Sequence, residues 1–438
     1  MDNNHFYVPF KLAFLIAVLM LLCFTSCSDG KSIYTFSKSQ QPVVDTIAVQ
    51  EIKLYLETSA SMRGYVNSNV SGTYPLKDIV PNMVTDLDNH FDLKTKLITI
   101  SDRQHKFPYS KVSFFEQVRS GRIFTGKSSK LQNIFSIVIS ETNTGAVSIL
   151  ISDCIPDLGR INTKTEGSKI TNHIYSIVSA NKTLGVAVFK YKSDFNGTFY
   201  YNSNNNDGVA QSKRPFYKQT LNNRPFYVWV FGNHTAVKKV LATNTIKGYD
   251  MAHAYNMPFN TTEAGLLKNP KSGKISINPE KGTLLIKEID AERPALFTIG
   301  LNGKSLSKVQ QEQLLDTTNY KVIPSYIQES ITFNLKQKEA LLSEDIKDKS
   351  EIQNGDYTYF IQPALSDFDL QTQKFSINIF NKQSSWIKNT NLIDDIGIAA
   401  DALEGKTFGF EFITDAFANA YPAKQPQITF TLTKQKQK

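Results

Sequence analysis

Segments with strand-like and helix-like patterns alternate from about Glu51 to Asn244, and this alternation constrains the fold more than any other feature. The apolar runs that predict strands are "IKLYLE", "TKLITIS", "AVSILIS", "LGVAVFKY" and "RPFYVWVFG". The segments between and after them predict helices at residues 75–91, 131–143, 168–182 and 234–244. Strands that alternate with helices favour a parallel sheet covered on both faces. The sequence therefore predicts a doubly wound α/β domain over residues 50–245.

After about Thr245 the sequence pattern changes to short runs in which apolar and polar residues tend to alternate, separated by turn residues. These runs are "GKISINP", "GTLLIKEI", "ALFTIGL", "SITFNL", "YTYFIQPAL" and "KFSINIFN". They predict a β-rich, sandwich-like C-terminal domain over residues 246–438. Within it, we expect a helical segment near residues 393–421, and we expect "QITFTLT" to return to the sheet as a last strand.

The N-terminus has the pattern of an export signal. Lys11 precedes an apolar stretch from Leu12 to Phe24, which is typical of a secretory signal core and too short to cross a bilayer comfortably. The stretch ends in "FTSC", in which two small residues stand before Cys27. This ending resembles the lipobox of bacterial lipoproteins. The alternative is an ordinary signal peptide with an incidental cysteine.

The lipobox resemblance implies that residues 1–26 are removed and that Cys27 is acylated. Ser28 follows the cysteine in place of Asp, which by the same resemblance implies the outer membrane rather than retention in the inner membrane. The next stretch is polar, so residues 27–49 are expected to be the lipidated cysteine and a tether. We therefore expect a lipid-anchored protein of the cell envelope that faces either the periplasm or the outside.

Composition and motifs argue against several other functions. The net charge of +9 and the pI near 9.1 come from scattered lysines, without a dense run that would mark a nucleic-acid groove. The chain lacks H-E-x-x-H, G-x-S-x-G and paired-cysteine motifs. Beside the lipidated Cys27, the mature chain would keep only Cys154, which excludes an internal disulfide. We expect Cys154 to be a buried small residue rather than a nucleophile, and we expect no enzymatic activity.

The stretch "GRIFTGKS" satisfies the phosphate-loop pattern G-x-x-x-x-G-K-[ST] with Gly121, Gly126, Lys127 and Ser128. A phosphate-binding loop follows directly from a buried strand, so that its amides converge on the phosphates. The preceding "EQVRS" is too polar for the end of a buried strand, and an exported protein meets little ATP. We therefore interpret the match as accidental and expect no bound nucleotide.

A second pattern uses more residues, together with their predicted positions. Glu57, Ser59 and Ser61 form an acid-x-Ser-x-Ser spacing directly after the first strand. Ser129 stands just before a predicted helix, and Asp153 follows the strand after that helix. This region of the chain resembles the von Willebrand factor A-like fold, in which these three loops hold one divalent cation at the carboxyl edge of a parallel sheet.

The resemblance implies a role for each of these side chains. Ser59 and Ser61 would be direct ligands, Ser129 rather than Ser128 would supply the third-loop hydroxyl, and Asp153 would bind directly or through water. An oxygen shell of this kind suits Mg²⁺, or less specifically Ca²⁺ or Mn²⁺. In the family, an open coordination position takes a carboxylate from a partner protein.

The sequence departs from the family at two positions. Glu57 replaces the family's Asp and is one methylene longer, and Ser129 replaces the usual Thr. We expect a lipoprotein that binds an unknown envelope protein with the help of the cation. One alternative is a metal-dependent envelope hydrolase, for which the sequence offers no convincing general base. The other is a structural assembly subunit whose metal site has decayed, which Glu57 favours.

Overall fold

The computed structural model describes most of the chain after residue 30. The described residues are 31–40, 47–67, 75–101, 103–126, 129–142, 145–158, 163–199, 217–259, 261, 263–289, 291–393 and 400–436. The predicted signal peptide, Cys27, Lys127 and Ser128 lie outside these ranges. No helix within them has both the length and the apolar character that a membrane crossing requires.

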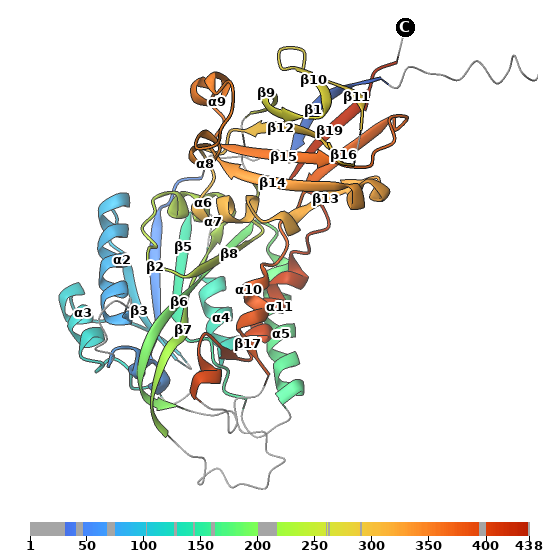
Figure 1. Ribbon diagram of the computed structural model, residues 1–438. Coiled ribbons are helices and arrows are strands. Elements are labelled where there is room, and N and C mark those ends of the chain that lie inside the picture. Colours follow the sequence, from blue (N-terminus) through green and yellow to red (C-terminus); the bar gives the residue numbers. More distant parts are fainter. Residues whose placement is uncertain are drawn as a thin grey trace, which may run out of the picture.

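The first domain is built on one sheet of seven strands (Figure 1). Their spatial order is β4 (Gln104–Lys106), β3 (Lys96–Ile100), β2 (Glu51–Glu57), β5 (Ala146–Ser152), β7 (Tyr217–Asn233), β6 (Leu184–Phe199) and β8 (Met251–Tyr255). β2 pairs parallel with both β3 and β5. The pairings of β4 with β3, β7 with β5 and β6, and β8 with β6 are antiparallel.

The sheet is therefore mixed, and the expectation of a parallel sheet is wrong for four of its six strand pairings. β6 and β7 form a long hairpin whose pairing runs from Leu184 opposite Asn233 to Phe199 opposite Tyr217. β7 inserts between β5 and β6, where a parallel arrangement would place β6 directly beside β5. Apolar runs show that strands are buried on both faces, but they do not show in which direction the strands run.

Helices cover both faces of this sheet, as predicted. The helices on one face are α2 (Leu76–Phe91), α3 (Lys111–Arg119) and α6 (His234–Ala242). Those on the other face are α4 (Leu131–Ser140), α5 (Thr163–Ala180), α10 (Ser385–Thr390) and α11 (Phe410–Ala420). The sequence patterns predicted α2, α4, α5 and α6 but missed α3. Ser110 caps the start of this short helix, and its side chain accepts a hydrogen bond from the N–H of Ser113.

The second domain consists of two antiparallel sheets that share an apolar core. The larger sheet has the order β10 (Lys274–Asn278), β11 (Thr283–Glu288), β1 (Ser32–Gln40), β19 (Ile428–Lys434), β16 (Lys374–Ile379) and β13 (Tyr320–Ile323). The smaller sheet has the order β14 (Ile331–Gln337), β15 (Tyr359–Leu365), β12 (Ala295–Leu301) and β9 (Ala264–Ser272). The predicted sandwich character and the returning last strand β19 are both present.

Short elements complete the described part of the chain. The helices among them are α7 (Lys308–Leu314), α8 (Lys338–Leu342) and α9 (Ser350–Asn354). The 3-10 helices are η1 (Ala60–Tyr65), η4 (Thr317–Asn319), η5 (Ser325–Ser330) and η6 (Ala400–Leu403). A small parallel pair joins β17 (Asn391–Leu392) and β18 (Thr407–Phe408).

The predicted tether over residues 27–49 is wrong for the segment that forms β1. β1 lies inside the larger sheet of the sandwich, between β11 and β19. Ser32 and Tyr34 point into the domain and are buried, whereas Ile33 between them and Thr35 after them are exposed. Small and polar residues occupy many positions of this strand, so its composition is that of a linker although its alternation is that of a strand.

The domain boundary predicted near residue 246 is also wrong in part. β8 lies at the edge of the first sheet, and α11 returns late in the chain to pack against α5. The hydroxyl of Thr171 on α5 donates a hydrogen bond to the carbonyl oxygen of Phe412 on α11 at 2.8 Å. The first domain therefore includes C-terminal segments, and the sandwich includes the N-terminal strand.

Candidate cation site at the carboxyl edge of the mixed sheet

The three predicted site loops meet at one edge of the first sheet. β2 and β5 are parallel neighbours, so their carboxyl ends lie side by side. The loop after β2 is joined to the loop before α4 by a bridge between Ser59 and Gly126. The N–H of Ala60 donates to the carbonyl oxygen of Gly126 at 3.0 Å, and the N–H of Gly126 donates to that of Thr58 at 2.8 Å. A Cβ at position 126 would lie 3.0 Å from the Thr58 oxygen, which explains the glycine here.

Glu57, the last residue of β2, is fully buried at this edge. The hydroxyl of Ser129 donates a hydrogen bond to its Oε1, and the hydroxyl of Ser152 donates to its Oε2. Both carboxylate oxygens therefore have partners inside the protein. The sequence analysis did not select Ser152, although it is the last residue of β5 and directly precedes Asp153.

Asp153 is 1% exposed and lies beside Glu57. Its Oδ1 accepts a hydrogen bond from the N–H of Ile155 at 3.2 Å, whereas its Oδ2 has no hydrogen-bond partner within the described part of the chain. The hydroxyl oxygens of Ser59 and Ser61 are 2.9 Å apart in the first loop. The structure thus brings all five predicted ligands together.

The two carboxyl groups raise each other's cost of ionisation. Burial raises the pKa of Glu57 to about 7, and the neighbouring charge of Asp153 contributes to the rise. The hydroxyls that donate hydrogen bonds to Glu57 act in the opposite direction. Burial also raises the pKa of Asp153, while the charge of Arg224 and the hydroxyl of Ser61 act in the opposite direction. When Glu57 and Asp153 are both ionised, the single positive charge of Arg224 leaves an excess of one negative charge at this buried edge.

Arg224 is a member of this site that the sequence analysis missed. Its side chain is 4% exposed, and its guanidinium lies 4.3 Å from the ring centroid of Phe199 and 5.1 Å from that of Phe195. Tyr227 on β7 pairs with Ser152 on β5, so the residues just before Tyr227 lie at the carboxyl edge. The antiparallel insertion of β7 therefore brings the positive charge of Arg224 to the site. A charged residue directly before the apolar run "PFYVWVF" was the signal in the sequence.

The residues present fit a small, hard cation. Hydroxyls and carboxylates are the available donors, and the unpartnered Oδ2 of Asp153 is the oxygen most in need of a partner. Across the described ranges, His, Cys, Asp and Glu side chains form no metal-binding group of three or more. A cation at this edge would therefore depend on the serine hydroxyls as well as on Glu57 and Asp153.

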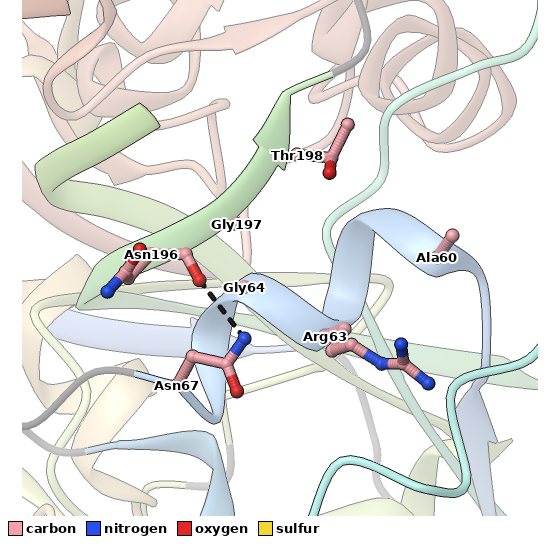
Figure 2. Close-up of a pocket in the computed structure, with 7 residues that line it drawn as sticks. All are labelled: Ala60, Arg63, Gly64, Asn67, Asn196, Gly197 and Thr198. Carbon is pink, nitrogen blue, oxygen red and sulfur yellow. Dashed lines mark hydrogen bonds between the residues drawn. The ribbon is translucent and has the colours of Figure 1, made fainter. Parts of the chain in front are cut away.

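A pocket of 340 Å³ opens beside the first loop of the site. Figure 2 shows Ala60, Arg63 and Asn67 on one side of it and residues 196–198 of β6 on the other. The side-chain amide of Asn67 donates to the carbonyl oxygen of Asn196 at 3.2 Å and closes one end. The exposed Arg63 adds a positive charge to the wall of this pocket.

The structural context of the phosphate-loop match differs from that of a nucleotide site. The helix α3, not a strand, precedes Gly121, which has a φ of 70°. Gly126 belongs to the backbone bridge with Ser59. This context agrees with the interpretation of the match as accidental.

Cys154, predicted to be buried, is fully buried and receives a hydrogen bond from Trp229 Nε1 at 3.2 Å. Burial raises the pKa of its thiol well above the usual value, so the reactive thiolate is disfavoured.

Comparisons with family models, with curated proteins and with solved structures found no match to this chain.

Proposed function

We propose that this protein is a lipid-anchored envelope protein that binds a partner protein at the carboxyl edge of its mixed sheet, with the help of a divalent cation. The observation that carries the proposal is the buried, unpartnered Oδ2 of Asp153 beside four other oxygen-bearing side chains from three loops. Buried polar atoms in native proteins normally have a partner, and a cation would supply one.

The residues that would hold the ion are Glu57, Ser59, Ser61, Ser129 and Asp153. When bound, Mg²⁺ would neutralise the two carboxylates and offer a coordination position to an acidic side chain of the partner. The parallel set β3-β2-β5 supports a von Willebrand factor A-like relationship, whereas the antiparallel β7 departs from it. The pocket beside Ala60, with Arg63 in its wall, gives an acidic side chain of the partner a place to dock.

A second function is favoured by Arg224. Burial raises the pKa of Asp153, and the buried positive charge of Arg224 already lies close enough to oppose part of that rise. Both oxygens of Glu57 are also occupied by hydroxyl donors. In this alternative, the arginine replaces the cation, and the domain is a structural assembly subunit whose metal site has decayed.

Calorimetry and thermal unfolding with Mg²⁺, Mn²⁺ and Ca²⁺ separate the two functions. A cation that binds only the native state stabilises it by about 2.7 kcal/mol when the free cation concentration is a hundred times the Kd. We expect the wild type to respond, Asp153→Ala to lose the response, and the remote control Asp86→Ala to keep it. If the wild type shows no heat of binding and no thermal shift but the Glu57→Asp variant shows both, the result would support the decayed site. If neither the wild type nor Glu57→Asp responds, the cation proposal is wrong.

The proposed anchor is tested separately. Cys27→Ala should abolish metabolic labelling by fatty acids and move the protein to the soluble fraction, whereas Cys154→Ala should leave both unchanged. Retention of the Cys27→Ala variant in the membrane would contradict lipid anchoring at this residue. A pull-down of the unlipidated protein from envelope extract, with and without Mg²⁺, then identifies the partner.

A further inference from the structure

The start of β1 and the end of β19 lie together at one end of the sandwich (Figure 1). The two strands are antiparallel neighbours, with Tyr34 opposite Lys434. Ser32 is buried, and its hydroxyl donates a hydrogen bond to a backbone carbonyl oxygen at 2.8 Å. The N–H of Gln435 donates to the carbonyl oxygen of Ile33 at 2.7 Å. The chain is therefore part of the folded domain from Ser32 onward.

This position of Ser32 limits how far the domain can stand from a lipid on Cys27. Only residues 28–31 lie between the two. An extended chain spans at most about 3.6 Å per residue, so the Cα atoms of Cys27 and Ser32 can be about 18 Å apart at most. A free tether over residues 27–49 would have allowed about 80 Å by the same estimate. The sandwich end is thus held close to whatever surface receives the lipid.

The exposed side chains at this end suit an anionic lipid surface. Lys31 precedes β1, Lys436 follows β19, and Lys287 follows the β11 residue that pairs with Ser32; all three lysines are exposed. Two carboxyl groups lie near these lysines: Glu288 follows Lys287 and forms an ion pair with Lys274, and the charge of Asp369 helps to raise the pKa of Tyr34 after the larger effect of burial. Lysines close to an anionic membrane each contribute about 1 kcal/mol of attraction.

Apolar side chains are exposed at the same end. Ile33 on β1 is 41% exposed and Tyr326 in η5 is 59% exposed. The hydroxyl of Tyr326 lies 3.1 Å from that of Thr372, and the hydroxyl of Tyr34 donates to the carbonyl oxygen of Thr372 at 3.1 Å, which places Tyr326 beside β1. Tyrosine is enriched at membrane–water interfaces because its ring is apolar and its hydroxyl is polar.

We propose that this sandwich end, formed by Lys31, Ile33, Lys287, Tyr326 and Lys436, lies on an anionic lipid surface. The proposal rests on the proposed lipid anchor at Cys27 and names the surface that the anchored chain presents to the membrane. In Figure 1, β2 and β5 run away from the sandwich, so the candidate cation site lies at the far end of the molecule. The anchored protein then presents that site away from the membrane, where a partner can reach it.

Chemical coupling tests the orientation without depending on acylation in cells. The mature chain is coupled through Cys27 to a maleimide lipid in vesicles of phosphatidylcholine and phosphatidylglycerol; Cys154 is fully buried and will not compete. Hydrogen exchange by mass spectrometry then compares coupled with free protein. We expect slower exchange in residues 325–330 and 366–373 and unchanged exchange in residues 60–67. Protection of residues 60–67, or no protection at the sandwich end, would overturn the proposal.

Charge reversal supplies the matched control. The Cys27→Ala protein is sedimented with phosphatidylglycerol vesicles at low salt, and Lys31→Glu with Lys436→Glu should weaken its binding at least about tenfold. Lys106 and Lys130 are exposed lysines of the first domain. The double substitution Lys106→Glu with Lys130→Glu should leave binding to the vesicles unchanged. Equal effects of the two pairs would overturn the assigned surface. Acyl labelling of Cys27 in cells decides the anchor itself, so failure of one proposal can be told from failure of the other.

Discussion

The hydroxyl of Ser129 donates a hydrogen bond to the carboxylate of Glu57, which lies 72 residues earlier in the chain. This contact joins the loop before α4 to the end of β2, and Ser152 at the end of β5 completes the arrangement from the other side. The longer side chain of Glu57 therefore has two internal donors at the edge where the family resemblance implies Asp.

The buried carboxyl of Glu57 should make stability depend on pH in the absence of metal. Its pKa in the folded protein, about 7, lies above its ordinary value of 4.5. Such a group favours the folded state most below its unfolded pKa and loses this contribution as pH rises through the folded pKa. Denaturant unfolding in EDTA from about pH 5 to pH 8 should show a loss on the order of 2–3 kcal/mol in the wild type.

Glu57→Gln has no charge to titrate and should lack this part of the pH dependence, so that it becomes more stable than the wild type near pH 8. Ser129 and Ser152 can rotate their hydroxyls to serve the amide. Parallel curves for the two proteins across this range would contradict the assigned pKa shift.

The buried cation of Arg224 should be coupled to Asp153. Arg224→Met leaves the two buried carboxyl groups without a positive charge and should cost about 3 kcal/mol of unfolding free energy. Adding Asp153→Asn should restore part of this loss, with a coupling of about 1–2 kcal/mol in a double-mutant cycle. Arg224→Lys keeps the charge but loses the planar contact with Phe199, so its stability should be intermediate. Strict additivity of the two substitutions would show that the charges do not interact.

The N-terminal strand should be essential to the sandwich. Tyr34 is fully buried, and its ring lies 5.9 Å from those of Phe368 and Phe375. Tyr34→Ala should destabilise the protein by about 3–5 kcal/mol, because it leaves a large cavity. The neighbouring control Ile33→Ala removes a side chain that is substantially exposed and should cost less than about 1 kcal/mol. Equal, small effects in thermal unfolding would mean that β1 is a tether after all.

Lys127 should have no role in nucleotide binding. The helix α3 precedes the loop where a phosphate-binding site needs a buried strand, and Gly126 is engaged with Ser59. The purified wild type should show no heat with ATP and Mg²⁺, and Lys127→Ala should match it in melting temperature and partner binding. Saturable ATP binding that disappears in Lys127→Ala would reverse this interpretation.

Much of the fold could be predicted because its signals are local. The apolar run of β5 and the helical pattern of α4 are visible in any short window of the sequence. The acid-x-Ser-x-Ser spacing likewise placed Glu57, Ser59 and Ser61 together at the end of the first strand, because so short a segment cannot leave that edge of the sheet. What could not be predicted was the neighbour of each strand, since β6 and β7 have the same apolar character as parallel strands but form a hairpin.

By itself, the sequence determined the strands β2 and β5, the helices α2, α4, α5 and α6, and the places of Glu57 and Asp153 at the carboxyl ends of the two strands. These properties depend on periodicity and spacing within a few residues. Only the tertiary structure decided that β7 runs antiparallel and brings Arg224 to Asp153, and that Ser32–Gln40 is a sandwich strand rather than a tether. Strand direction and partner choice depend on side chains that meet from distant parts of the chain, so a polar strand such as β1 becomes recognisable only when β11 and β19 lie beside it.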